Sequence, residues 1–342
     1  MSNTRLPLHE LVETIKIFLE VGENYKETGL RLKLNRGSIY NRLNTPKAKS
    51  MLAEAKKDPK YLETMQLEMD DILFQQYQKI STLETQIREL QQFRKIHTNY
   101  FYTDTVRFGL VSDTHIGSLY AAKDYLETAY NVFQEEKIRD VYHCGDLTDG
   151  ENMYRGQVYE IFRHGCDAQV EEVVNNYPQR PGISTHFILG NHDMSFWKRA
   201  GINIGPKIAL ARDDMFYLGV EEADVVFKGE DGRFARVRLS HPGKGTAYAL
   251  SYQIQKYIES LTGGNKPHVL LVGHYHKAEV IPQYRNVYAV QAGTLEHQTP
   301  WMRSRNIAAM TGFWIIEFSV NVPKKVSRFK AEWFSFFEEE TE

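Results

Sequence analysis

The tetrapeptide Gly190-Asn191-His192-Asp193 is the stretch from which the fold of this chain is predicted. It follows a short apolar run, residues 186–189, so we expect a loop leaving the end of a β-strand. Gly, Asn and Asp favour turns for backbone reasons alone, so by itself the tetrapeptide fits an ordinary turn equally well. It also places an amide, an imidazole and a carboxylate at three consecutive positions. These side chains make it a candidate ligand-bearing turn.

Four further turns of this kind occur along the chain. Each follows an apolar β-type run and carries carboxylate or imidazole groups: Asp113-Thr114-His115, Gly145-Asp146, Ser240-His241-Pro242 and Gly273-His274-Tyr275-His276. Loops at the ends of buried strands can bring such side chains together at one edge of a sheet. Carboxylate, imidazole and amide donors suit borderline divalent cations, and no thiolate favours zinc alone. We therefore expect these side chains to bind divalent metal, Mn²⁺ first, with Zn²⁺, Fe²⁺ and Ni²⁺ as alternatives.

From residue 106 onward, short β-type runs alternate with helical stretches. The expected strands are 106–112, 141–144, 186–189, 225–227, 236–240, 269–272, 287–291, 314–318 and 329–334. The expected helices are about 121–136, 167–177 and 247–261. The segment 147–165 is loop-like and rich in polar and aromatic residues, which favours an excursion on the substrate side. This alternation predicts an α/β domain.

The five turns, in this order, resemble those of the calcineurin-like metallophosphoesterase superfamily: D-x-H, G-D, G-N-H-D, H and G-H-x-H. The resemblance extends from about residue 105 to the C-terminus, and every ligand block is present. It implies a β-sandwich flanked by helices, with two metals at one edge. It also implies that Asp113, His115 and His276 hold one metal, that Asn191, His241 and His274 hold the other, and that Asp146 bridges both.

The same resemblance implies the chemistry of a two-metal phosphodiesterase. A hydroxide bridging the cations attacks phosphorus in line, and the cations clamp the phosphoryl oxygens. His192 corresponds to the family's acid, which protonates the leaving oxygen, and Asp193 is placed to orient it through the other ring nitrogen.

The N-terminal part of the chain is basic, although the whole chain carries a formal net charge of -2. Between residues 24 and 60 there are ten Lys and Arg residues against three acidic residues, a local net charge of +7. A basic module joined to a mildly acidic one indicates two separate tasks.

This basic module has the pattern of a small helical bundle. An apolar face over residues 8–19 predicts a first helix that ends near Gly22, and a second short helix starts at about Asn24. Asn35 is placed to cap a third helix, residues 36–44, which stops before Pro46. On this third helix we expect Arg36, Ser38, Asn41 and Arg42 to face outward and to bind DNA.

Residues 22–43 resemble the helix-turn-helix of the Fis and resolvase-like families, in which such a helix lies in the major groove. The chain departs from those families at the small residue and the turn glycine, with Thr28-Gly29 and Lys33 around these places. The alternative is a helical bundle whose basic face is only solvated or docks on a protein.

Residues 60–97 contain no Gly or Pro and predict a long helix. Apolar positions recur every seven residues at Leu73, Ile80 and Ile87, which gives a narrow seam like that of a short coiled coil. Such a helix either spaces two modules or joins two copies in a homodimer; the alternative is a helix folded back on its own domain. We thus expect a helix-turn-helix head over residues 1–50, a connector over 51–103 and a metallophosphoesterase domain over 104–342.

A metal centre of this type serves many phosphoesters, and the attached head favours a polymer substrate. We expect a DNA nuclease similar to the DNA-repair exonucleases of the superfamily. Aromatic residues near the motifs are available to stack on bases or belong to the core: Tyr154, Tyr159, Phe162, Phe196 and Trp197. The first alternative is a small-nucleotide or cyclic-nucleotide phosphoesterase whose N-terminal helices mediate self-association or partner docking. The second is a DNA-binding regulator with a vestigial metal site.

Composition agrees with a globular protein: 42% of the 342 residues are hydrophobic and 25% are charged. No apolar run approaches the roughly 20 residues that cross a bilayer, and the first residues lack the apolar stretch of a signal peptide. The two cysteines do not form a disulfide framework. We expect a cytoplasmic protein without membrane association.

Overall fold

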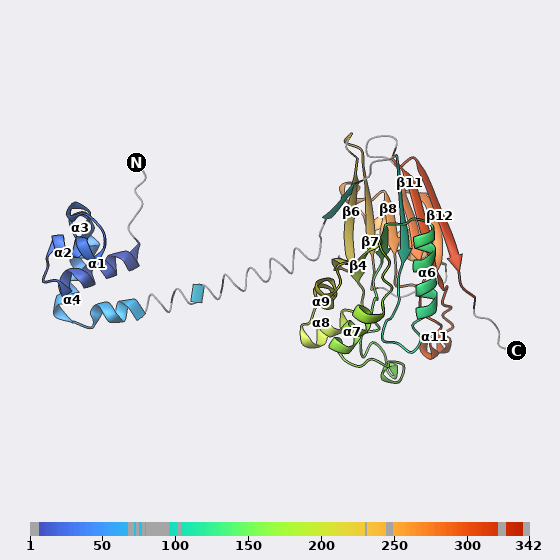
Figure 1. Cartoon of the computed structure of the whole chain (residues 1–342), viewed down its shortest axis with the longest axis horizontal. Helices are drawn as coiled ribbons and strands as arrows, with labels where there is room; N and C mark the ends of the chain where they lie inside the picture. The colour runs from blue at the N-terminus through green and yellow to red at the C-terminus, as the bar shows by residue number, and fades with distance from the viewer. Residues whose placement is uncertain are drawn as a thin grey trace. The chain divides into compact units, whose positions relative to one another are not determined.

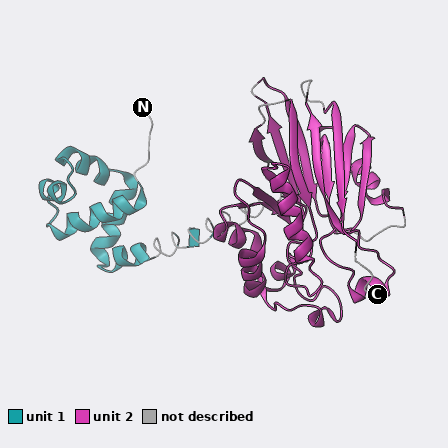
Figure 2. Ribbon diagram, turned by 45° about the vertical axis from the view of Figure 1, so that its right-hand side comes forward, with its two compact units in different colours: residues 1–88 teal, residues 89–342 magenta. Residues whose placement is uncertain are grey.

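The computed structural model describes residues 7–67, 72, 75, 76, 79, 96–100, 104–229, 231–243, 249–320 and 326–337. The chain divides into two compact units, residues 1–88 and residues 89–342 (Figure 2). No helix among the described residues combines the length and the apolarity needed to span a bilayer.

The first unit contains four named helices (Figure 1): α1 (Leu8–Glu20), α2 (Tyr25–Arg31), α3 (Arg36–Leu43) and α4 (Pro46–Lys57). Polar side chains cap three of them. Asn24 Oδ1 accepts the backbone N–H groups of Lys26 and Glu27, and Asn35 Oδ1 accepts that of Ser38. Thr45 caps α4, with a proline in the first turn. The predicted cap at Asn35 is confirmed, and the apolar face of α1 packs into one core with residues of α3 and α4.

A tight approach between α2 and α3 explains the two departures from the helix-turn-helix pattern. A Cβ atom on Gly29 would lie 2.6 Å from the carbonyl oxygen of Leu34, so no larger residue fits there. Lys33 adopts a φ of 54°, the left-handed conformation that a glycine usually supplies in such a turn. Gly29 therefore allows the close packing against Leu34, and Lys33 forms the turn although it is not a glycine.

The predicted long helix is wrong at its C-terminal end. Residues 61–67 are helical, whereas the seam positions Leu73, Ile80 and Ile87 lie outside the described residues. Residues 96 and 97 belong to strand β1 (Ile96–Tyr100), which pairs in parallel with β6. Because β1 extends that sheet along its ladder of hydrogen bonds, strand pairing overrides the helical periodicity there.

The second unit contains two six-stranded sheets. In the first sheet the strand order is β1, β6 (Glu222–Lys228), β7 (Phe234–Ser240), β8 (Val269–Val272), β10 (Val287–Ala292), β9 (Ala278–Tyr284). In the second it is β12 (Arg328–Ser335), β11 (Gly312–Ser319), β2 (Thr105–Val111), β3 (Asp140–His143), β4 (Ser184–Leu189), β5 (Met215–Val220). Every strand expected from the sequence is present, and the fold is mixed α/β.

A hydrophobic core lies between the two sheets, and helices cover their outer faces. Residues from β2, β11, β7 and β8 share the central core. On the second sheet, the covering helices are α6 (Lys123–Glu135), α7 (Cys166–Asn176), α8 (Ser195–Ala200) and α9 (Ile204–Ala211). On the first sheet, α10 (Tyr252–Ser260) packs against β8 and β10. The remaining short helices are η1 (Gln157–Tyr159), η2 (Gly263–Asn265) and α11 (Pro300–Ser304).

The direction of five strands positions the site. Strands β2, β3 and β4 run parallel to one another, and so do β7 and β8. Each of these strands ends within two residues of the start of one of the five ligand-bearing turns. Carboxyl ends of neighbouring parallel strands open at the same edge of a sheet, where α/β folds place their ligands.

Candidate metal centre

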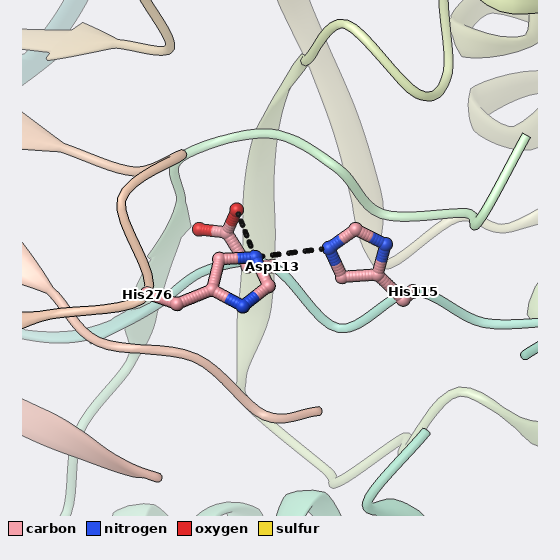
Figure 3. A group of neighbouring side chains, drawn as sticks. All are labelled: Asp113, His115 and His276. Carbon is pink, nitrogen blue, oxygen red and sulfur yellow. Dashed lines mark hydrogen bonds and ion pairs between the residues drawn. The ribbon is translucent and has the colours of Figure 1, made fainter. Parts of the chain in front are cut away.

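The first group of predicted ligands comes from the turns after β2 and β8. His276 Nε2 lies 3.3 Å from Asp113 Oδ1 and 3.3 Å from His115 Nε2, so the three side chains point toward one another (Figure 3). All three are buried. Two ligand atoms about 2.1 Å from one cation are roughly 3.0–3.4 Å apart, so this spacing fits a single bound ion.

The second group comes from the turns after β3, β4, β7 and β8. His241 Nε2 lies 3.0 Å from Asp146 Oδ2 and 3.1 Å from Asn191 Oδ1. The imidazole of His274 completes a set with Asp146 and His241 in which one ligand atom of each lies within 4.8 Å of the others. The structure thus brings all seven predicted metal ligands to one edge of the sandwich, in two adjacent groups.

The backbone at these ligands is unusual. Asp113, His115, Asp146, His274 and His276 all have φ between 44° and 79°, the left-handed region that non-glycine residues rarely occupy. Such conformations cost about 1–3 kcal/mol each and persist where the surrounding fold over-determines them, typically at functional sites. Five of the seven predicted ligands carry this strain.

Two glycines of the motifs are required by close packing around the ligands. A Cβ on Gly190 would lie 2.2 Å from Asp146 Oδ1 and 2.7 Å from His241 Nε2. Gly145, at a φ of 95°, would place a Cβ 2.5 Å from His241 Nδ1. The glycines therefore leave the room that the carboxylate and the imidazole occupy.

The protonation of the donors suits a cation. Burial raises the pKa of Asp113, but the neighbouring His276 and His241 outweigh it and lower the pKa to about 2. Burial and the nearby His241 lower the pKa of His274 to about 4. Burial lowers the pKa of His241, but the carboxylate of Asp146 outweighs it and raises the pKa to about 9. Metal ligands must be deprotonated, so the ionised Asp113 and the neutral His274 fit a divalent metal as they stand, whereas His241 would release a proton on binding one. Among the described residues, the groups that could hold an ion also include His115 with Asp149 and His192.

The partner of His192 differs from the one predicted. Its Nδ1 lies 2.7 Å from the carbonyl oxygen of Asp149 and 3.5 Å from Asp149 Oδ1. Burial lowers the pKa of His192, but the carboxylates of Asp146 and Asp149 outweigh it and raise the pKa to about 10. A cation bound by Asp146 would neutralise part of that effect. Asp149, three positions after Asp146, is a site residue that the sequence prediction missed.

The orienting role predicted for Asp193 is wrong in this structure. Its carboxylate accepts hydrogen bonds from the backbone N–H groups of Leu147, Thr148 and Gly190 and from Thr148 Oγ1. The carboxylate therefore ties the turn after β3 to the turn after β4. It supports both ligand loops, and none of these hydrogen bonds involves the ring of His192.

Glu296 is a second residue that the prediction missed. It is 2% exposed, its Oε1 accepts from Ser118 Oγ, and its Oε2 lies 3.7 Å from His115 Nε2. The same oxygen is 4.0 Å from His276 Nδ1, a buried nitrogen without a hydrogen-bond partner among the described residues. Burial and the nearby Asp149 raise the pKa of Glu296. The signal for Glu296 in the sequence was weak: the residue follows the Gly293-Thr294 turn at the end of β10.

A cavity of about 360 Å³ opens onto the two groups. Its lining includes His115, Asp146, Asn191, His192, His274 and His276. The volume lies in the usual range of about 300–1,000 Å³ for small-molecule sites. Ligand atoms for two cations and the His192 ring therefore share one cavity.

The residues predicted to bind DNA lie in the first unit, on α3. Arg36 and Asn41 are exposed, and Ser38 is half-buried. Arg42 differs from the prediction, because its guanidinium donates to Glu10 Oε2 at 2.7 Å and to Thr14 Oγ1 at 3.2 Å. The amphipathic pattern placed Arg42 on the outer face, but its long side chain reaches back to α1 and pairs there.

Comparison with known proteins bears on the second unit. A family model described as the calcineurin-like phosphoesterase superfamily domain matches residues 106–310. No curated protein matches the chain.

Solved structures similar to this chain include a predicted phosphoesterase from Streptococcus pneumoniae, at 14% identity, covering 68% of this chain and 99% of that one with a TM-score of 0.30. GAP50, described as the anchor in the inner membrane complex of Plasmodium, is 12% identical over 68% of this chain and 85% of its own, with a TM-score of 0.40. A dimetal phosphatase from Danio rerio is 12% identical over 66% of this chain and 95% of its own, with a TM-score of 0.33.

Proposed function

The chain belongs to the calcineurin-like phosphoesterase superfamily and is a metal-dependent phosphoesterase, and from this premise we propose that it cleaves phosphodiester bonds in DNA. The observation that carries the proposal is the pairing of this hydrolase unit with a basic helical unit in one chain. The first supplies the chemistry and the second supplies affinity for a polyanion.

In this proposal the two groups of side chains hold two divalent cations. Asp113, His115 and His276 would hold one, Asn191, His241 and His274 would hold the other, and Asp146 would be shared by both. Bound there, the cations supply Lewis acidity: an activated water and neutralisation of charge on the phosphoryl oxygens. The donor set favours Mn²⁺, with Zn²⁺, Fe²⁺ or Ni²⁺ as alternatives.

The protein's own proton donor is His192. The carbonyl oxygen of Asp149 fixes the proton on Nδ1 and thereby directs Nε2 away from the backbone. The ring lines the cavity and its centroid is 4.6 Å from that of His115, so it stands beside the first group of ligands. From this position His192 delivers a proton to the leaving oxygen.

The first unit supports a nucleic-acid substrate by its charge and its exposed helix face. Residues 24–60 carry a net charge of +7, and Arg36 and Asn41 project from α3 without burial. Helix α3 follows α2 after a turn in which Lys33 is left-handed, and this succession has the layout of a helix-turn-helix. In this proposal α3 contacts DNA and raises the local concentration of phosphodiesters at the metal centre.

The proposal is tested with purified protein, Mn²⁺, and labelled single-stranded and double-stranded DNA. We expect cleavage of DNA, with chelation by EDTA abolishing it. In Arg36→Ala/Asn41→Ala, the ratio of kcat/KM for DNA to kcat/KM for methyl 4-nitrophenyl phosphate should fall. Arg139→Ala, which removes an exposed arginine of the second unit, is the matched control and should retain the wild-type ratio.

The alternative is a phosphoesterase for small nucleotides, favoured by a cavity whose size suits a small molecule. It predicts rapid turnover of small diesters, no cleavage of DNA, and the same turnover of small diesters in the wild type and in Arg36→Ala/Asn41→Ala. That result would exclude the nuclease and leave the metal-dependent phosphoesterase in place.

A further inference from the structure

One wall of the metal-site cavity is not made of metal ligands. Next to the histidines, the cavity is lined by Met153 and Tyr154 from the loop after β3, and by Trp301, Met302, Arg305 and Ile307 in and after α11. This surface, the aromatic wall, combines two rings, apolar side chains and one cation. None of its members can serve as a ligand for a hard or borderline metal except the tyrosine oxygen.

The planar groups of the aromatic wall are arranged in a stack. The Tyr154 and Trp301 rings lie 5.1 Å apart between centroids, with an angle of 27° between their planes. The guanidinium carbon of Arg305 lies 4.9 Å from the Trp301 ring centroid. Because Arg305 is exposed, its side chain can move aside for a ring or pair with one, as arginine does in nucleic-acid sites.

Both halves of the stack are held in place by polar contacts. Tyr154 Oη donates to Glu160 Oε2 at 2.6 Å, which fixes the phenol ring. Thr299 Oγ1 accepts the backbone N–H of Met302 at 3.2 Å and caps α11, the helix that carries Trp301. A wall positioned in this way loses little conformational entropy when a ligand stacks on it.

We propose that the aromatic wall is a subsite for one unpaired nucleobase, that of the nucleotide adjoining the scissile phosphate. The inference rests on the proposed function and names the part of the substrate that the site recognises. A phosphate held by the two groups of ligands places its ester substituents in the same cavity as the wall. Stacking on aromatic rings and on a guanidinium is the chemistry that recognises bases without regard to sequence.

The base must be unpaired in order to reach the aromatic wall. Inside a duplex both faces of a base are already stacked, and a base reaches a cavity wall only at a single-stranded segment, at a frayed end or after flipping. The inference therefore predicts preference for single strands, for strand ends or for small nucleotides over the interior of a duplex. The four remaining aromatic candidates do not line the cavity and take no part in this wall: Tyr159, Phe162, Phe196 and Trp197.

The test compares two substrates with the same leaving group and charge, with Mn²⁺ present. Thymidine 5′-(4-nitrophenyl phosphate) carries a base, and methyl 4-nitrophenyl phosphate does not. In Trp301→Ala we expect the ratio of kcat/KM for the nucleoside ester to kcat/KM for the methyl ester to fall by about 5- to 100-fold, as loss of base stacking predicts. Trp301→Phe should restore most of the ratio, because a ring remains.

A pair of arginines at the C-terminal end of α11 supplies the matched control. Arg305→Ala should lower the ratio, whereas Arg303→Ala removes an exposed charge outside the cavity lining and should keep the wild-type ratio. The Arg305 pair also tests the wall if Trp301→Ala fails to fold. Equal ratios in the wild type, Trp301→Ala and Arg305→Ala would overturn the inference.

A second arm separates the sources of the base. A single-stranded oligonucleotide with one base-free tetrahydrofuran unit should be cut more slowly at that unit by the wild type, and this contrast should shrink in Trp301→Ala. If DNA is cleaved at equal rates at all units by both proteins, the inference fails and the nuclease stands. If only the small nucleoside ester shows the Trp301 dependence and DNA is untouched, the subsite stands and the nuclease fails.

Discussion

The metal centre and the outer face of α3 use polar side chains in opposite ways. At the metal centre five of the seven predicted ligands are buried, five sit on a strained backbone, and neighbouring glycines leave room for only one arrangement. On α3, Arg36 and Asn41 are exposed and their rotamers are not fixed by packing. The fold thus specifies positions where a reaction needs them, and it leaves charge free to adapt where a flexible polyanion would bind.

The largest effect should come from removing a charge where positions are fixed. Asp146 lies 3.0 Å from His241 and is the ligand proposed to be shared by both cations, so Asp146→Asn should lower kcat by roughly 10³-fold or more, because metal Lewis acidity contributes several kcal/mol. Metal content, measured by mass spectrometry of the purified protein, should fall with it. Asp124→Asn, an exposed position at the start of α6, should keep both the rate and the metals. Two bound metals and a wild-type rate in Asp146→Asn would contradict the assignment.

The next prediction separates the contribution of the proton donor to the rate from that of the cations. His192→Ala should retain its metals and lose roughly 10²- to 10⁴-fold in turnover of diesters with poor leaving groups, the usual contribution of a general acid. Activated 4-nitrophenyl esters need less protonation and should lose much less. His164→Ala, exposed and outside the cavity lining, is the control. Equal losses on both kinds of ester would remove His192 from the acid role.

The fold was predictable from the sequence where local signals and tertiary packing agree. The apolar runs before the ligand turns are strands, and the cap at Asn35 starts a helix. The short strands β5 and β9 and the helices α8, α9 and α11 were not predicted, because brief segments carry too little periodicity. Strand β1 was hidden within a helical pattern, since its pairing with β6 depends on residues about 130 positions away.

The site was predictable to the extent that its chemistry is encoded in short turns. Seven ligands in five motifs converge as expected, because each motif contains its own turn glycine or follows a parallel strand. Partners that depend on side-chain direction were not predictable: Asp149 rather than Asp193 contacts His192, and Arg42 turns back to Glu10. Glu296 also required the structure, since it approaches His115 from a separate part of the chain.

Paired charges extend the comparison from chemistry to stability. Arg238 is 1% exposed and donates to Asp224 at 2.6 and 3.0 Å, so Arg238→Met leaves a buried carboxylate and should cost about 3–5 kcal/mol. The Arg42–Glu10 pair is partly exposed, and Arg42→Met should cost only about 0–1 kcal/mol.

The chain allows the two units to be followed separately. All four tryptophans lie between residues 197 and 333, so their fluorescence reports unfolding of the second unit in urea, while circular dichroism also reports the helices of the first. Similar losses in the free energy of unfolding for Arg238→Met and Arg42→Met would contradict the distinction between buried, fixed charges and exposed, adaptable ones.

A smaller effect concerns how far the fixed region extends beyond the predicted ligands. Glu296 Oε2 faces His115 and His276, so Glu296→Gln should weaken binding of one of two Mn²⁺ ions by about 10- to 100-fold, as loss of an outer carboxylate does. Isothermal titration of metal-free protein with Mn²⁺ measures it directly. Glu317→Gln, which removes a carboxylate paired with Arg107 far along β11, should leave both affinities unchanged. Two unchanged affinities in Glu296→Gln would confine the centre to the predicted ligands.

A small effect that depends on pH belongs to Glu172, a buried carboxylate with half-exposed partners. Lys123 Nζ and Arg163 Nε lie 2.5 and 2.7 Å from its two oxygens. Burial raises the pKa of Glu172, but these cations outweigh it and lower the pKa below its usual 4.5. A lowered pKa in the folded state means that the pair stabilises above about pH 4.5 and that this stability is lost as the pH falls through the lowered value.

Glu172→Gln should therefore lower the free energy of unfolding by about 1 kcal/mol at pH 7, a modest value because solvent screens both cations. The difference from the wild type should shrink below pH 4.5 as the native carboxylate takes up a proton. Glu171→Gln, the exposed neighbour on α7, should show no such pH dependence. Urea unfolding between pH 3.5 and 7 measures both variants. A difference that persists unchanged in acid would show that Glu172 acts through packing, which would place it with the fixed side chains of the metal centre rather than with the adaptable charges of α3.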